Sequence, residues 1–243
     1  MRKVVAIGIL AAALAATACS QAKSENAGPS ISRNYPVGGF TAIEVAGPYD
    51  VEVHTGGQPA VSATGPQKMI EQMMVEVKGD QLRIYPREHR GIFHMGWNIS
   101  GGTVRVAVTV PQLRGASIAG SGDIRVNQVR GNAFEGNVAG SGSLGVDALD
   151  VQTLKLAIAG SGGVKAASGR AQSAKYEIGG SGDIDARGLQ AQTAEVSIAG
   201  SGSVSAHATG TAAVNIMGSG DVEVTGGAKC SVSKQGSGDV RCS

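Results

Sequence analysis

The sequence predicts an all-β protein built as a single-stranded parallel β-helix, a solenoid with coils of about 18–20 residues. Two observations support this fold: a Gly-Ser-Gly motif that recurs at even intervals, and apolar columns at fixed offsets from it. The motif is centred on seven serines: Ser121, Ser141, Ser161, Ser181, Ser201, Ser219 and Ser237. Leucine-rich and ankyrin solenoids have repeats of similar length, but Gly costs about 1 kcal/mol inside a helix, so a helical solenoid is rejected.

The apolar columns predict which side of each strand is buried. The third residue before and the third after each central serine are apolar and mostly β-branched, as are most residues seven before and five after it. Odd offsets share one face of a strand, so we expect Ile158 and Ile178 to be buried and Ser161 and Ser181 to face solvent. Both glycines of the motif are expected to point inward and let the chain turn a corner. An apolar signal eight residues after the serine has the opposite parity, which predicts a turn before it.

The N-terminal residues 1–18 read as a signal peptide, with a basic start, an apolar stretch and a small-residue end. The following Leu-Ala-Ala-Thr-Ala-Cys19 resembles the lipobox of bacterial lipoproteins, so Cys19 is predicted to be lipidated and to anchor the protein in a membrane. Ordinary cleavage after Ala18, giving a freely secreted protein, stays open. Ser20 resembles the sorting pattern for the outer membrane, so the predicted location is the bacterial cell envelope, lipid-anchored at the outer membrane.

Beyond the signal, the chain divides into a tether and one domain. Residues 19–37 are polar, contain two prolines and predict a flexible tether behind the lipidated Cys19. Residues 38–243 are predicted to form one β-helical domain, with irregular first coils over 38–112 and the seven repeats over 113–243. Within the irregular part, only Gln67 to Gln72 could hold a helical turn.

The charge of the mature chain argues against a nucleic-acid partner. Arg2 and Lys3 leave with the signal, after which basic and acidic side chains are equal in number. Proteins that bind nucleic acid need a clustered basic excess to meet the phosphates, and this chain has none.

One loop carries a cluster of aromatic and imidazole side chains: His89, Phe93, His94 and Trp97. The simpler interpretation is a loop that packs its own Phe and Trp onto the rod. The functional interpretation is a recognition loop, with Trp as an anchor for a glycan or an envelope protein. Two His without Cys make a weak metal signal, so no metal site and no cofactor are predicted.

The repeated serines and aspartates are explained by stacking rather than by catalysis. No unit satisfies the Gly-x-Ser-x-Gly pattern of hydrolases, and the outward serines are expected to bond hydroxyl to hydroxyl between coils. Asp123, Asp183, Asp221 and Asp239 invite a calcium interpretation, but Ser143, Gly163 and Ser203 interrupt the column. Carboxylates that cap turns are favoured, and no catalytic residue is predicted.

Several motifs together resemble one known family. These are the lipoprotein-type signal, the opening Gly-Gly-Phe40-Thr-Ala-Ile-Glu-Val, the step Asp80-Gln-Leu-Arg-Ile, and Val-Thr-Val-Pro111-Gln-Leu before the repeated Ala-Gly-Ser-Gly-Asp. Over about residues 38–243 the chain resembles the putative auto-transporter adhesin head GIN domain family. The resemblance implies a β-helical, exported, mostly bacterial domain whose activity is not established, and it offers no catalytic motif.

Two classes of function follow from these observations. The favoured one is a non-enzymatic cell-envelope lipoprotein that presents a rigid polar face for adhesion, scaffolding or glycan contact. The alternative is a polysaccharide-active lyase or hydrolase, which rests on fold analogy alone. Such an enzyme needs carboxylates at glycosidase separation, and the repeats show no convergent set.

The last two cysteines are predicted to form a disulfide that closes the final coil. Cys230 lies seven residues before Ser237 and Cys242 five after it, which are two inward offsets, so both thiols are expected to face the interior. The bond requires the two Cα atoms to come within about 7 Å across the coil. Two unpaired buried thiols are the alternative.

Overall fold

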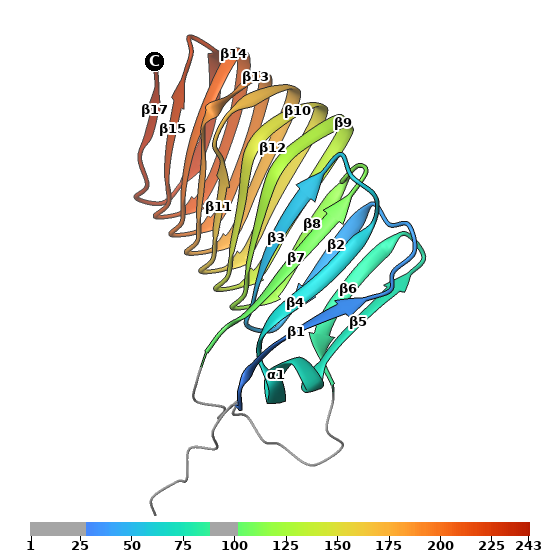
Figure 1. Cartoon of the computed structure of the whole chain (residues 1–243). Helices are drawn as coiled ribbons and strands as arrows, with labels where there is room; N and C mark the ends of the chain where they lie inside the picture. Colours follow the sequence, from blue (N-terminus) through green and yellow to red (C-terminus); the bar gives the residue numbers. More distant parts are fainter. Residues whose placement is uncertain (1–27, 88–101) are drawn as a thin grey trace, which may run out of the picture.

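The computed structural model of the protein describes residues 28–87 and 102–243. Cys19 and the loop residues His89, Phe93, His94 and Trp97 lie outside the described residues. The described chain forms seventeen strands and one short helix, linked into one sheet system around a single apolar core. Figure 1 shows the later strands stacked as successive coils along a rod. The predicted β-solenoid is confirmed, with about six turns.

The regular stack begins after the family-like Pro111-Gln-Leu step and runs to the C-terminus. Its strands are β8 (Gly115–Gly120), β9 (Asp123–Gly140), β10 (Ser143–Gly160), β11 (Gly163–Ala166), β12 (Gly169–Gly180), β13 (Asp183–Gly200), β14 (Ser203–Gly218), β15 (Asp221–Thr225), β16 (Lys229–Gln235) and β17 (Val240–Cys242). Neighbouring coils pair in parallel, and equivalent residues face each other, as Ile178 faces both Ile158 and Ile198.

Each twenty-residue coil has three sides, because its buried positions fall into three groups. On the first side, the buried residues are one, three and five positions after the central serine, and on the second side they are eight and ten positions after it. On the third side, the buried residues are seven, five and three positions before the next central serine. Ile158 and Ile178 are buried as predicted, and so is Leu149, but the turn predicted before Leu149 is absent, because β10 continues unbroken through this segment. The sequence interpretation missed the column five before the serine, where Tyr176 is fully buried.

The Gly-Ser-Gly motifs form one corner of the solenoid. Ser161 and its equivalents are exposed, as predicted. Only the second glycine of each motif is buried; the first, such as Gly160 with φ 130°, takes the left-handed conformation that turns the chain, which corrects the expectation that both point inward. A Cβ on Gly162 would strike the backbone oxygen of Gly142 in the coil before it. Neighbouring corners are joined by a backbone bond, from Ser161 N–H to Gly140 O at 2.9 Å, and not by the expected hydroxyl pairs.

The N-terminal region extends the third and first sides of the stack with irregular strands, since β2 pairs with β8 and β3 pairs with β9. Its elements are β1 (Ser30–Tyr35), β2 (Ala42–Ala46), β3 (Tyr49–Thr55), β4 (Ala60–Pro66), α1 (Gln67–Gln72), β5 (Met73–Lys78), β6 (Gln81–Pro86) and β7 (Val104–Val110). Helix α1 has the predicted bounds. Ala46 faces Ala119 and Asp50 faces Asp123, so Gly47-Pro48-Tyr49 occupies the corner that Gly-Ser-Gly fills in later coils.

Three antiparallel pairings correct the expectation of a purely parallel array at this end. They join β1 to β4, β4 to β7 and β5 to β6. The first coil has no preceding coil to cover its edges, and these strands cover them instead. Residues 30–35, predicted to belong to the flexible tether, form strand β1 because Ile31 and Tyr35 pack against the core.

The C-terminal coil is closed by two side-chain devices. Cys230 and Cys242 form the predicted disulfide, with Cα atoms 6.6 Å apart. Contrary to the expected interior position, Cys230 is half-buried and Cys242 exposed, because no other coil of the described residues covers them. Lys234 Nζ donates to Gly238 O at 2.7 Å. In an earlier coil the equivalent oxygen, that of Gly162, accepts a backbone N–H from the next coil, so the ammonium replaces the missing strand.

Candidate functional site

The predicted recognition loop joins β6 to β7. Strand β6 pairs with β2, and β7 pairs with β3, so these two strands lie next to the strands that flank the Gly47 corner. The described ends of this connection are Arg87 and Gly102. His89, Phe93, His94 and Trp97 lie outside the described residues, and their role stays a prediction.

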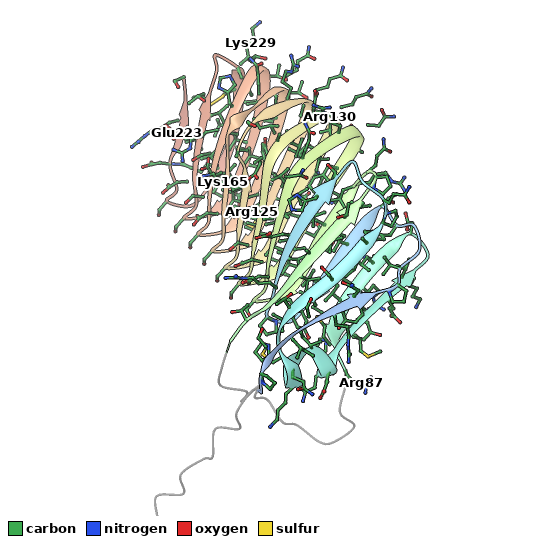
Figure 2. The ribbon with its side chains drawn as sticks, viewed as in Figure 1. Arg87, Arg125, Arg130, Lys165, Glu223 and Lys229 are labelled. Atoms are coloured by element: carbon green, nitrogen blue, oxygen red, sulfur yellow. A yellow bond between two sulfur atoms is a disulfide. The ribbon has the colours of Figure 1, made fainter. Side chains whose placement is uncertain are left out.

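Within the described residues, the outer surface of the first side carries the most varied polar chemistry. It consists of two columns, two and four residues after each corner, which we call the first-side groove. The first column contains Asp50, Asp123, Ser143, Gly163, Asp183, Ser203, Asp221 and Asp239; the second contains Glu52, Arg125, Gly145, Lys165, Asp185, Ser205, Glu223 and Arg241. Figure 2 shows Arg125, Lys165 and Glu223 on one side of the rod, away from Arg130 and Lys229.

Two hollows lie in the first-side groove. The larger, of about 580 Å³, extends from β3 to β13 and has Ser143, Gly145 and Gly163 as its floor. It exists because these residues have little or no side chain, while Arg125 on β9 and Lys165 on β11 line it on the two strands beside Gly145 of β10. The smaller, of about 210 Å³, continues over β14, β15 and β17. Together they form the candidate ligand site of the protein.

The aspartates of the groove are held in place by the backbone. Asp123 Oδ1 accepts the N–H of Ser143 at 2.8 Å, and Asp183 Oδ1 accepts that of Ser203 at 3.1 Å. Asp221 Oδ1 likewise accepts the N–H of Asp239 at 2.8 Å. The carboxylates therefore cap the backbone of the following coil, close to the predicted capping role. One oxygen of each is engaged in this way, and the other can accept a hydrogen bond from a ligand.

The pKa values of two groove carboxyls are shifted in opposite directions. Asp50 lies beside Asp123 in the sheet register. Burial, together with the nearby charges of Asp123 and Glu52, raises the pKa of Asp50, while Arg105 partly offsets this. At the other end, hydrogen bonds from Arg187 hold the pKa of Asp185 below its ordinary value, with Nε 2.9 Å from Oδ1.

The third side carries a ladder of lysines and glutamates that form ion pairs with one another. Lys155 Nζ lies 3.3 Å from Glu177 Oε2 and 3.9 Å from Glu135 Oε1. Lys175 Nζ lies 3.1 Å from Glu177 Oε1 and 3.2 Å from Glu195 Oε1. Exposed pairs of this kind contribute between zero and about 1 kcal/mol each. A hollow of about 540 Å³ beside the ladder holds the Asp80–Arg114 pair. Because its charges already have partners, this surface is a weaker candidate site.

The described residues contain neither a cluster of metal-ligating side chains nor a membrane-spanning helix. No three His, Cys, Asp or Glu side chains in residues 28–87 and 102–243 come together in a group that could hold a metal ion. The helix α1 is short, and the described chain has no helix that could cross a membrane.

Fold and groove define a class: a β-solenoid whose outer sheet presents a charged, hollowed surface. Residues 39–228 match the family described as putative auto-transporter adhesin, head GIN domain, and the chain belongs to this family. The resemblance inferred from the opening strands and the repeats is thereby confirmed.

Solved structures share the fold. A putative adhesin from Bacteroides fragilis NCTC 9343 has a TM-score of 0.79 and 25% identity, over 88% of this chain and 97% of that one. A protein from Parabacteroides distasonis ATCC 8503, described as a putative lipid binding protein, has a TM-score of 0.67 and 26% identity, over 89% and 97%. A putative adhesin from Parabacteroides merdae ATCC 43184, at 20% identity, has a TM-score of 0.66 over 90% and 98%. The search of curated proteins found no match.

The sequence interpretation found the aspartate column but missed the hollows. Gly145 and Gly163 stand at even, outward offsets, where the repeat otherwise places larger polar side chains. Two small residues on adjacent coils in these outward columns are therefore the sequence signal that predicts the floor of the larger hollow.

Proposed function

We propose that this chain is a non-enzymatic cell-envelope lipoprotein, anchored through a lipid on Cys19 at the outer membrane, which contacts a glycan or an envelope protein through the first-side groove. The observation that carries the proposal is the larger hollow, where carboxylates and cations surround a floor of Gly145 and Gly163. A binding role for adhesion or scaffolding fits the family description, which names an adhesin.

The rigidity of the groove supports a binding role. Its side chains stand on paired strands, and the backbone N–H of Ser143 fixes the carboxylate of Asp123. A ligand that binds groups already held in place loses less conformational entropy on binding, which favours affinity at a given contact area. The groove can therefore recognise a partner without any movement of the solenoid.

One observation favours the alternative, a polysaccharide hydrolase. Asp50 and Asp123 lie side by side, and the pKa of Asp50 is raised. A general acid in glycoside hydrolysis needs a carboxyl with a raised pKa beside a second carboxylate. Binding and turnover therefore have to be measured together.

A glycan-array screen of the soluble chain, run beside a panel of polysaccharide lyase and hydrolase substrates, tests the proposal. We expect retention on one class of glycan and no release of unsaturated or reducing-end products. If the wild type forms such products and the Asp50→Asn variant does not, the protein is an enzyme and the non-enzymatic proposal is wrong. If the chain binds no glycan on the array and cross-linking captures no envelope protein, the proposed binding role is wrong.

The anchor has its own test. Cys19→Ser should release the protein from membranes or leave an uncut precursor. If this variant fractionates with membranes as the wild type does, the anchor lies elsewhere.

A further inference from the structure

We infer that the first-side groove takes a linear, uncharged, hydroxyl-rich polysaccharide that lies along the solenoid axis, across the strands, and contacts both hollows. This inference rests on the proposed function of glycan contact and adds the class and the direction of the ligand. Four features of the groove support it: its continuity, its width, its unpaired donors and acceptors, and its net charge.

The two hollows are parts of one continuous path. The larger ends on β13 and the smaller begins on β14, and these strands are direct neighbours, with Asp183 facing Ser203. The path crosses eight strands of the first side, from β3 to β17. At about 4.8 Å between strands, it is roughly 34 Å long. This length accommodates several sugar rings.

The groove is narrow in the other direction. Along each strand only two outward residues lie between the buried positions of the first side, as Ser143 and Gly145 do before the parity of burial changes between Val146 and Leu149. Residues two apart on a strand are separated by about 7 Å. A polymer laid along a strand would overhang both edges, whereas one laid along the axis meets the same two columns at every coil.

The chemistry of the groove suits hydroxyl groups. Neither Arg125 nor Lys165 has an ion-pair partner within 4.0 Å among the described residues, so both can donate to a ligand. Asp123 retains one carboxylate oxygen that can accept, because the other is bonded to Ser143. A sugar hydroxyl both donates and accepts, and can therefore bridge such a carboxylate and such a cation. The floor at Gly145 leaves room for the ring itself.

The charge of the groove excludes anionic polymers. Carboxylates outnumber cations by eight to three among the residues that line the two hollows. Uronate-rich polysaccharides and nucleic acids would meet a surface of their own sign. Neutral glycans meet no such repulsion.

The test uses the soluble full chain and defined oligosaccharides. Cello- and laminari-oligosaccharides of two, four, six and eight units are titrated calorimetrically, with alginate oligosaccharides of the same lengths as the charged comparison. We expect one neutral series to gain at least about tenfold in affinity between two and six units, as successive coils are engaged, and the alginate series to bind weakly.

Three leucine variants locate the site. Gly145→Leu fills the larger hollow at a position where a Cβ meets nothing within 4 Å, so it should reduce affinity for every length about tenfold at an unchanged melting temperature. Ser205→Leu, over the smaller hollow, should weaken only the six- and eight-unit ligands. Ala159→Leu, exposed on the third side, is the matched control and should change nothing.

The outcomes separate this inference from the function on which it rests. The lengthwise groove is wrong if glycan binding does not depend on length, is stronger for alginate, or is confined to glycans outside the two neutral series. It is also wrong if Gly145→Leu leaves binding unchanged. In each of these cases the protein is still a glycan-binding module. Absence of binding to every glycan on the array overturns both.

Discussion

The two ends of the solenoid close their cores with different devices. At the N-terminal end, β1, β4 and β5 pair antiparallel with their neighbours and cover the edges left by β6 and β7. At the C-terminal end, the stack stops after β17, where Lys234 and the Cys230–Cys242 bond stand in for a further coil. A repeated coil covers its neighbours but cannot cover the ends, so the departures from the repeat gather there.

The cores of the two regions differ in how regularly their buried side chains repeat. The N-terminal region fills its core with large side chains such as Tyr49, Ile84 and Met69. In the stack, the buried residue five after the serine is a valine or an alanine in coil after coil: Val126, Val146, Ala166, Ala186, Ala206 and Val224. In the stack, therefore, the offset of a residue from the central serine sets its environment. In the N-terminal region, each residue has an environment of its own.

The largest effect is expected from a charge placed inside the stack. Ile178 is 3% exposed and faces Ile158 and Ile198. Ile178→Asp should destabilise the protein by more than about 4 kcal/mol, because the carboxylate would be buried without a partner. Amide hydrogen exchange should show lost protection in β10, β12 and β13, while Ser181→Asp, on the exposed corner, leaves exchange unchanged. Full protection in the Ile178 variant would overturn the register.

The same contrast explains how far the sequence could predict the structure. In the stack, the same offsets from the central serine apply to successive coils. The burial of Ile178, the exposure of Ser181 and the cysteine pairing could therefore be predicted from these offsets. Gly47-Pro48-Tyr49 keeps only the first glycine of the motif, and it could not be recognised as a corner without the pairing of Asp50 with Asp123.

The antiparallel edge strands depend on contacts between residues far apart in sequence, for which no local pattern exists. Strand β1 is an example, because its polar sequence buries only Ile31 and Tyr35 in part. The hollows depend on which outward residues stack across coils, and this was readable in principle from Gly145 and Gly163.

The second effect concerns the C-terminal end alone. Cys230→Ala combined with Cys242→Ala opens a loop of twelve residues, which the loop-entropy model values at roughly 3 kcal/mol. The loss should be confined to β16 and β17, because each coil contacts only its neighbours. Hydrogen exchange measures this, and thiol labelling of the unfolded, unreduced wild type should find neither cysteine reactive. Labelling of both would contradict the bond.

The third effect separates a glycine that the stack requires from one that it tolerates. A Cβ on Gly162 would meet backbone of the preceding coil, whereas one on Gly145 meets nothing within 4 Å. Gly162→Ala should cost about 1–3 kcal/mol by overpacking, and Gly145→Ala should stay within about 0.5 kcal/mol of wild type. Chemical denaturation measures both. Equal stabilities would mean that the coils separate enough to admit a methyl group at the corner.

The smallest effect tests the junction of the two regions, where Asp50 of β3 meets Asp123 of β9. Folding raises the Asp50 pKa above 3.8 through burial and the neighbouring carboxylates, so its charged form opposes folding. This cost is fully present above the folded pKa and disappears as the pH falls below the unfolded one. Asp50→Asn should therefore raise the melting temperature near pH 7 by no more than about 3 °C and leave it unchanged near pH 3.

Asp185→Asn is the control with the opposite sign. Arg187 lowers the Asp185 pKa, so the charged form favours folding at neutral pH, and this contribution fades as acid protonates the carboxylate. The variant should lower the melting temperature slightly near pH 7, by less than Asp50→Asn raises it, because the Asp185–Arg187 pair is exposed. Melting curves between about pH 3 and pH 7 measure both variants. If the two variants shift the melting temperature in the same direction, the crowding of carboxylates at the junction is not what separates Asp50 from the aspartate inside the stack.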